Sequence, residues 1–111
     1  MPSDRREMVR SLPWPFPDGE FPRELGAVVQ VTVLDGEMPA LLVIHDSEGD
    51  WLVGDGVNDP NPRGASVATH IWHAIERNSS MTQLASLPPG YQATRRWPGD
   101  PWVVSEAEPL H

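Results

Sequence analysis

Hydrophobic and polar residues alternate at the start of the regular part of the chain, and this spacing predicts a β-strand. Val29, Val31 and Val33 are separated by single polar residues, which is the two-residue period of a half-buried strand. Two further apolar runs, 41–44 and 51–53, each follow a turn that contains Asp and Gly. The 41–44 run does not alternate, which favours a central strand with both faces covered. We therefore expect a three-stranded antiparallel meander.

The next segment has the period of an α-helix. A loop rich in Gly, Pro, Asp and Asn spans 54–64, and Ser66 can cap a helix by accepting hydrogen bonds from the free backbone amides of its first turn. At about 100° per residue, the apolar side chains from there to Arg77 fall on one arc and the polar ones on the other. A second, shorter helix carrying Met81 and Leu84 is stopped by a Pro-Pro-Gly sequence. The apolar arc of the first helix comprises Val67, Ala68, Ile71, Trp72, Ala74 and Ile75.

The sequence pattern predicts two more strands near the end of the chain. Residues 91–97 form the fourth expected strand and 102–104 a short fifth, with a Pro-Gly-Asp-Pro turn between them. The predicted fold class is therefore α+β, in a single domain: an antiparallel-rich sheet of four to five strands with two helices inserted between the third and fourth strands. A length of 111 residues suits one domain with its own core.

The first quarter of the chain is rich in proline, which interrupts regular elements and favours an extended path. Trp14, Phe16 and Phe21 alternate with these prolines. We expect them to lie back across the domain as a strap, with a partner-gripping arm as the alternative. A short helix is expected at 3–12, where Met8 and Leu12 share a face. The expected division is a Pro-rich arm or strap at 1–24, an α+β domain at 25–104 and a frayed tail at 105–111.

The charge of the chain narrows the classes of partner. The net charge is −8, which argues against nucleic-acid binding because that requires basic residues to neutralise phosphates. Between residues 35 and 59 the chain has acidic residues and no arginine. Such a region attracts a basic protein or a cation, although an acidic surface kept for solubility explains it as well. The acidic residues there are Asp35, Glu37, Asp46, Glu48, Asp50, Asp55 and Asp59.

Other features exclude whole classes of chemistry. The absence of cysteine rules out disulfides, thiol nucleophiles and cysteine-based zinc sites. No apolar run approaches the ~18 residues of a membrane span, and no apolar segment follows the charges of the N-terminus. There is no Gly-x-Ser-x-Gly elbow, phosphate-binding loop or dinucleotide fingerprint. We therefore expect a cytoplasmic protein that is not an enzyme, binds no membrane and needs no cofactor.

Two groups of residues could bind metal. On a helix, His70 and His73 would share one face at i, i+3 spacing, with Glu76 a further oxygen ligand one turn along. An exposed polar face explains the same spacing, and the His-Glu-x-x-His general base is missing. The loop from Asp55 to Asp59 offers oxygen ligands to Ca²⁺ or Mg²⁺. It lacks the EF-hand spacing, so turn formation by Asp and Asn explains it more simply.

The aromatic and basic residues of the second half favour packing over a ligand platform. Tryptophan buries a large area and needs one partner for its ring N–H. On a strand, Arg95 and Arg96 would point to opposite faces, and pairing with the acidic residues explains them better than a ligand clamp. The tryptophans concerned are Trp51, Trp72, Trp97 and Trp102.

Several motifs between residues 45 and 102 carry a family resemblance. They are Asp-Ser-Glu-Gly-Asp-Trp-Leu-Val at 46–53, Leu-Pro-Pro-Gly-Tyr-Gln-Ala-Thr-Arg at 87–95 and Pro-Gly-Asp-Pro-Trp at 98–102. The preceding strand at 38–43 is also similar. With these motifs the chain resembles a family of small bacterial domains of unknown function, some of which are proposed to be immunity proteins of polymorphic toxin systems. The resemblance implies no catalytic residues.

The leading hypothesis is therefore a non-enzymatic protein-binding domain, of the kind that inhibits a toxin by covering its active site. An acidic surface accelerates association with a basic partner. Two alternatives stay open: a metal- or small-ligand-binding protein using His70, His73 and Glu76, and a homodimeric accessory domain with Trp14 or Phe16 at its interface. The residues expected to bind the partner are Asp46, Asp50, Asp55 and Asp59, with Trp51 as an anchor.

Overall fold

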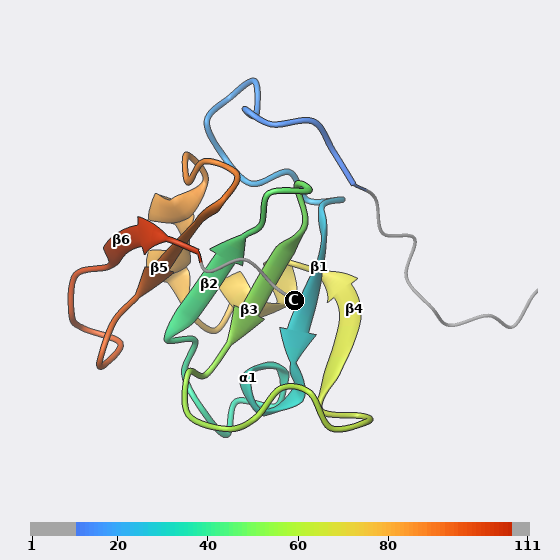
Figure 1. Cartoon of the computed structure of the whole chain (residues 1–111), viewed down its shortest axis with the longest axis vertical. Coiled ribbons are helices and arrows are strands. Elements are labelled where there is room, and N and C mark those ends of the chain that lie inside the picture. Colours follow the sequence, from blue (N-terminus) through green and yellow to red (C-terminus); the bar gives the residue numbers. More distant parts are fainter. Residues whose placement is uncertain (1–10, 108–111) are drawn as a thin grey trace, which may run out of the picture.

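The computed structural model describes residues 11–107. Six strands form one sheet in the order β4-β1-β3-β2-β5-β6, with short helical segments between them (Figure 1). Residues 11–107 include no helix with the length and apolar character that crossing a membrane requires. The elements are β1 (Gly26–Gln30), α1 (Val31–Leu34), β2 (Leu42–His45), β3 (Trp51–Gly54), β4 (Ser66–His70), α2 (Trp72–Ile75), the 3₁₀ helix η1 (Ser79–Leu84), β5 (Tyr91–Thr94) and β6 (Val103–Glu106).

The sheet is mixed, so the predicted antiparallel-rich sheet of four to five strands with two inserted helices is wrong. Strands β1 and β3 run parallel, with Val28 opposite Leu52, and the other neighbouring pairs are antiparallel. A parallel pair needs a crossover connection, and α1 with β2 provides it. Strand β2 consequently lies beyond β3 and does not pair with β1. Its place between β3 and β5 confirms the central position predicted for 41–44.

The alternating valines end in a helix. Only Val29 belongs to β1, while Val31 and Val33 lie in α1. The helical turn still buries Val33 completely, and the backbone amide of Val31 bonds to the carbonyl of Ala65 at 2.8 Å. Because a strand and a short helix bury the same side chain here, alternation could not distinguish them.

The long amphipathic helix expected from Ser66 is also wrong. Residues 66–70 form strand β4, which pairs along the whole of β1, and only Trp72–Ile75 is α-helical. Ile71 and Ile75 are buried and account for the helical period. Thr69, which is β-branched and suits a strand, is buried as well.

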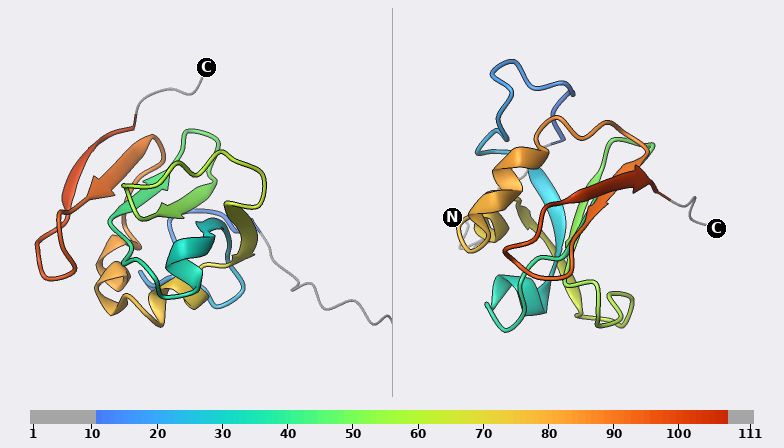
Figure 2. Two further views of the ribbon diagram at one scale, coloured as in Figure 1. Left: turned by 90° about the horizontal axis from the view of Figure 1, so that it is seen from below. Right: turned by 90° about the vertical axis from the view of Figure 1, so that its left-hand side faces the viewer.

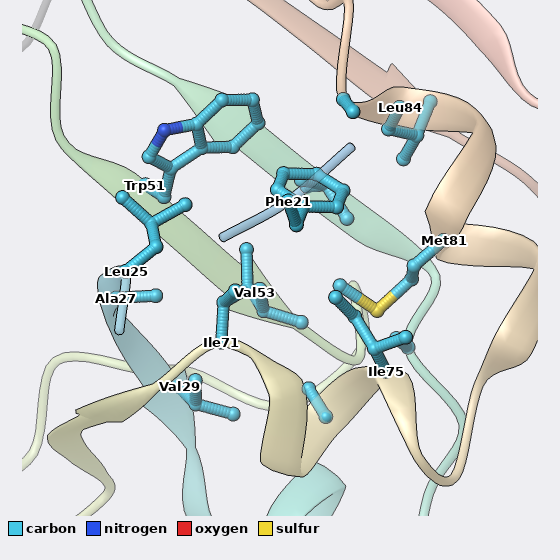
Figure 3. Close-up of a cluster of buried hydrophobic side chains, with 14 of the residues drawn as sticks. Phe21, Leu25, Ala27, Val29, Trp51, Val53, Ile71, Ile75, Met81 and Leu84 are labelled. Atoms are coloured by element: carbon cyan, nitrogen blue, oxygen red, sulfur yellow. The ribbon is translucent and has the colours of Figure 1, made fainter. Parts of the chain in front are cut away.

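The hydrophobic core lies between one face of the sheet and the helices. The helices gather on that side (Figure 2), where α1 packs against α2 and α2 against η1. Trp51 and Val53 of β3 meet Ile71 and Met81 from the helical side (Figure 3). Each large apolar side chain buried in this way stabilises the fold by roughly 1.5–3 kcal/mol.

The described part of the Pro-rich segment is built into this core. Phe16 and Phe21 are 6% and 3% exposed, and Phe21 meets the ring of Trp51 edge-on at 5.0 Å between ring centroids. The indole N–H of Trp14 donates to the carbonyl of Ala85 at 3.0 Å. Residues 11–24 therefore strap the domain and complete its core. The helix expected at 3–12 lies almost entirely outside the described residues.

The C-terminal end departs from the predicted tail. Ser105 and Glu106 are the last two residues of β6, which pairs with β5. The tail predicted at 105–111 therefore begins too early. Residues 108–111 lie outside the described part of the chain.

Candidate docking surface

The face of the sheet opposite the helices carries a row of apolar side chains. Alternate residues of a strand point to opposite faces, so Val28 and Leu52 lie on this face, while Val29 and Val53 point into the core. None of the described helices covers it, and it faces the viewer in Figure 1. We call it the open face. The strand register aligns Ala68, Val28, Leu52, Ile44 and Gln92 across β4, β1, β3, β2 and β5.

At the end of the sheet where the turn connects β2 to β3, the open face contains a shallow hollow of about 300 Å³. Its apolar lining includes Val28, Leu52 and Ala68, together with the buried Ala27 and Trp51. Two acidic residues, Asp46 and Asp50, border it. We call it the acidic hollow. It combines an apolar floor with negative charge, and no basic residue of the described chain lines it.

The acidic residues of the hollow are placed by the β2–β3 turn. One carboxylate oxygen of Asp46 accepts hydrogen bonds from the backbone amides of Glu48 and Asp50, at 3.0 Å and 2.9 Å. Gly49 has a φ of +92°, a conformation that side chains disfavour. Asp46 therefore builds the turn, whereas the exposed Asp50 makes its contacts to the turn through its backbone.

A second hollow of about 430 Å³ lies at the other end of the open face. Its lining includes the strand residues Leu42 and Thr94. It also includes the loop residues Val57, Arg96 and Trp97. Val57 and Trp97 are 70% and 61% exposed. The packing role expected for Trp97 is therefore wrong, and its indole ring is available to a partner.

The remaining tryptophans serve packing, as expected. Trp51 is buried, while Trp72 and Trp102 pack partly buried against the core. The indole N–H of Trp72 donates to the carbonyl of Phe21 at 2.7 Å. The guanidinium of Arg95 lies 4.1 Å from the ring centre of Trp102.

Asp55 is fully buried and holds the long loop between β3 and β4. Its carboxylate accepts hydrogen bonds from the Thr32 hydroxyl at 2.6 Å and from the amides of Val57 and Asn58 at 2.8 Å each. Burial has the largest effect on its pKa and raises it, but the hydrogen bonds together outweigh burial and lower the pKa to about 2. Asp55 is thus an ionised structural residue, which borders the second hollow but is itself fully buried.

Trp51 is also inaccessible. It is 2% exposed and stacks on His45, with ring centroids 3.9 Å apart. The Nδ1 of His45 donates to the carbonyl of Leu87 at 2.7 Å. Burial lowers the pKa of His45 more than its hydrogen bonds and the nearby Asp46 raise it. Trp51 is therefore a core residue, which borders the acidic hollow with almost none of its surface exposed.

Asp59 remains on the surface, away from both hollows. Its Oδ1 accepts hydrogen bonds from the backbone and side-chain amides of Asn61 at 2.9 Å and 3.0 Å. It lines neither hollow. Of the four acidic residues expected at the binding site, the structure brings together Asp46 and Asp50.

The histidine residues expected to bind metal lie on different elements. His70 ends β4 and His73 lies in α2, with ring centroids 5.9 Å apart. The imidazole of His73 lies 3.8 Å from a carboxylate oxygen of Glu76. Across residues 11–107, no three His, Asp or Glu side chains form a group that could hold a metal ion. The change from strand to helix at Ile71 removes the helical spacing on which the expected site depended.

Sequence reasoning did not find the apolar row itself. The uninterrupted apolar run of β2 was interpreted as covered on both faces, yet Leu42 and Ile44 are only partly buried and no described helix lies over them. The run therefore marks one core face and one open apolar face. Several neighbouring strands have apolar residues at consecutive positions, so both of their faces are apolar. This pattern is the signal that could have revealed the apolar row.

Comparisons with protein-family models, with curated proteins and with solved structures find no match for this chain. The resemblance to proposed immunity proteins stays a prediction. The open face and its two hollows are therefore the features of the molecule that bear on its function.

Proposed function

We propose that this chain is a non-enzymatic protein-binding domain that docks its partner on the open face of the sheet. The observation that carries the proposal is the apolar row through Val28, Leu52 and Ile44. On the same face, Leu42 lines the second hollow together with the exposed Val57 and Trp97. Contiguous apolar surface of this kind on a small protein marks an interaction site. Aromatic side chains such as Trp97 commonly carry much of the energy of such interfaces.

The polar chemistry of the described residues supports binding over catalysis. Catalytic acids and bases have perturbed pKa values within accessible clefts. Here the pKa is shifted at Asp55, His45 and Arg95; these residues border shallow hollows, but their side chains are buried. Arg95 donates to the carbonyl of Ala40 through Nε and Nη2 at 3.1 Å and 2.9 Å. Each perturbed group is thus engaged in holding the fold together.

The resemblance to proposed immunity proteins favours an inhibitory role, in which the open face covers the active site of a toxin. A rigid sheet suits that role, since little conformational entropy is lost on binding. The acidic charge favours a basic partner. A cytoplasmic location belongs to the same proposal.

Affinity capture from bacterial lysate with matched variants tests the proposal. Leu52→Glu places a charge in the centre of the apolar row. Gln83→Glu is the control, because it adds the same charge at an exposed position of η1, away from that row. We expect a stoichiometric partner on the wild-type protein and on Gln83→Glu, and its loss on Leu52→Glu. Circular dichroism and thermal unfolding check that each variant is folded. Retention of the partner on folded Leu52→Glu would contradict the proposal.

A second copy of the chain is the alternative occupant of the open face. Light scattering distinguishes it: a dimer at all concentrations that becomes monomeric in Leu52→Glu would assign the face to self-association. We expect a monomer for both proteins.

A further inference from the structure

We propose that the acidic hollow is where the docked protein partner inserts a basic side chain, an arginine or a lysine. The inference rests on the proposed function and deepens it, because it assigns recognition chemistry to one end of the open face. The apolar row supplies contact area, and the hollow selects for positive charge.

The lining of the hollow matches both parts of such a side chain. Arginine and lysine bury an aliphatic stem on apolar surface while the charged head stays at its edge. Val28, Leu52 and Ala68 provide that surface, and the carboxylates of Asp46 and Asp50 border it. A volume of about 300 Å³ lies at the lower limit of ligand-binding clefts, which suits one long side chain.

The Asp46 carboxylate is positioned before any partner arrives. Asp46 is fixed by two hydrogen bonds from the amides of Glu48 and Asp50. The backbone amide of Asp46 in turn bonds to the carbonyl of Asp50 at 2.9 Å. Groups that are already oriented lose less entropy on binding, so the turn provides a rigid acceptor for a guanidinium or ammonium group.

The negative charge of the chain and of the hollow favours a positively charged side chain as the occupant. The chain carries a net charge of −8, which attracts a basic partner over long range and raises its association rate. At the turn after α1, by contrast, the guanidinium of Arg77 lies close to Gly36, which stands between Asp35 and Glu37 in the sequence. The acidic hollow has no such basic residue in its described lining.

The test is a titration of ¹⁵N-labelled full-length protein with a peptide of alternating arginine and valine, followed by NMR. We expect saturable shifts of the amide resonances of Val28, Leu52 and Ala68. A peptide with citrulline in place of arginine keeps the shape and loses the charge, so it should cause no saturable shift. Equal shifts with both peptides, or shifts spread over all acidic loops, would overturn the proposal.

Matched variants separate the hollow from general electrostatics. Asp50→Asn removes one exposed charge from the hollow, and Asp35→Asn removes one exposed charge elsewhere. We expect the first to weaken peptide binding at least about tenfold, the lower end of the range for a hydrogen bond to a charged group, and the second to leave it within about twofold, as screening of distant charges implies. Equal weakening by both variants would overturn the inference.

Capture of the partner by Leu52→Glu and by Asp50→Asn distinguishes loss of the docking surface from loss of the basic side chain's binding site. A captured partner that is lost on Leu52→Glu but bound unchanged by Asp50→Asn would retain the docking surface and overturn the assignment of a basic side chain to the acidic hollow. The chain also has its own basic residues, Arg5, Arg6 and Arg10, ahead of Ser11, which lines the hollow. If replacing these three with glutamine shifts the hollow resonances without peptide, the occupant is the chain itself and the proposal is overturned.

Discussion

Val28 and Val29 are neighbours on the same strand, yet they belong to two different environments. Val29 points toward the helices and is fully buried, while Val28 points to the open face and is 40% exposed. One face of the sheet therefore stabilises the fold, and the other presents apolar surface without a described cover. Apolar residues of one strand thus serve two purposes: those on the helical side form the core, and those on the open face remain accessible to a partner.

The acidic residues on either side of β3 show the same division. Asp50 precedes the strand and is exposed, whereas Asp55 follows it and is fully buried. Asp55 accepts hydrogen bonds that fix the loop after β3. Identical side chains thus perform a structural role at one end of the strand and remain available at the other.

Replacing Asp55 should destabilise the protein far more than replacing Asp50. Asp55→Ala leaves the Thr32 hydroxyl and the amides of Val57 and Asn58 without their acceptor, and should lower the free energy of unfolding by about 3 kcal/mol. Asp50→Ala should change it by less than about 0.5 kcal/mol, as is usual for an exposed residue. Urea denaturation measures both, and similar losses in the two variants would contradict the assigned roles.

Substitution of the two valines tests the comparison of the faces directly. Val29→Ala should cost roughly 2 kcal/mol of unfolding free energy, because it removes buried methyl groups and leaves a cavity. Val28→Ala should cost less than about 1 kcal/mol, since that side chain is already partly in water. Both variants lose the same β-propensity, so their difference reports burial. Equal costs would show that the open face is covered.

Acid should destabilise the protein through Asp55. Its pKa is lowered from 3.8 to about 2 in the fold, so its ionised form stabilises the native state above pH ~4 and that stabilisation is lost as the pH falls toward ~2. The loss attributable to this residue is roughly 2 kcal/mol. Urea denaturation of wild type and Asp55→Asn across this range measures it. A wild-type pH dependence no steeper than that of Asp55→Asn would contradict the assignment.

The smallest expected effect concerns His45. Burial lowers its pKa below 6.5, so the fold favours the neutral imidazole, and the free energy of unfolding should fall as the pH decreases below the pKa of the unfolded chain. His45→Phe keeps an aromatic ring beside Trp51 and should remove the part of the pH dependence of unfolding that arises from protonation of His45. His73→Gln, on the exposed part of α2, should leave it in place. Identical pH dependence in wild type and His45→Phe would contradict the prediction.

Sequence reasoning found the strands that pack centrally and missed the elements whose pattern is ambiguous. β3 and β5 were predicted near their observed positions because each is a distinct apolar run bounded by turns. α1 and β4 were missed for opposite reasons. Val33 is buried by a helical turn that alternation does not exclude, and 66–70 became a strand because pairing along β1 outweighed local helical periodicity.

The docking surface was predictable only in part. Asp46 and Asp50 follow from their place in a hairpin turn, which exposes polar side chains. Asp55 looked equivalent in sequence, because the burial of a carboxylate depends on distant donors such as Thr32. Val28 and Leu52 are recognisable as strand residues, but which face of a sheet stays open depends on where the helices pack.

The most direct test of the docking surface is a methyl NMR spectrum of the protein, labelled at valine and leucine, on addition of the captured partner. Val28 and Leu52 report the open face, while Val29 and Leu84 report the helix-covered core. We predict that the methyl resonances of Val28 and Leu52 shift and that those of Val29 and Leu84 stay nearly in place. Shifts confined to the helical side, with Val28 and Leu52 unchanged, would contradict docking on the open face.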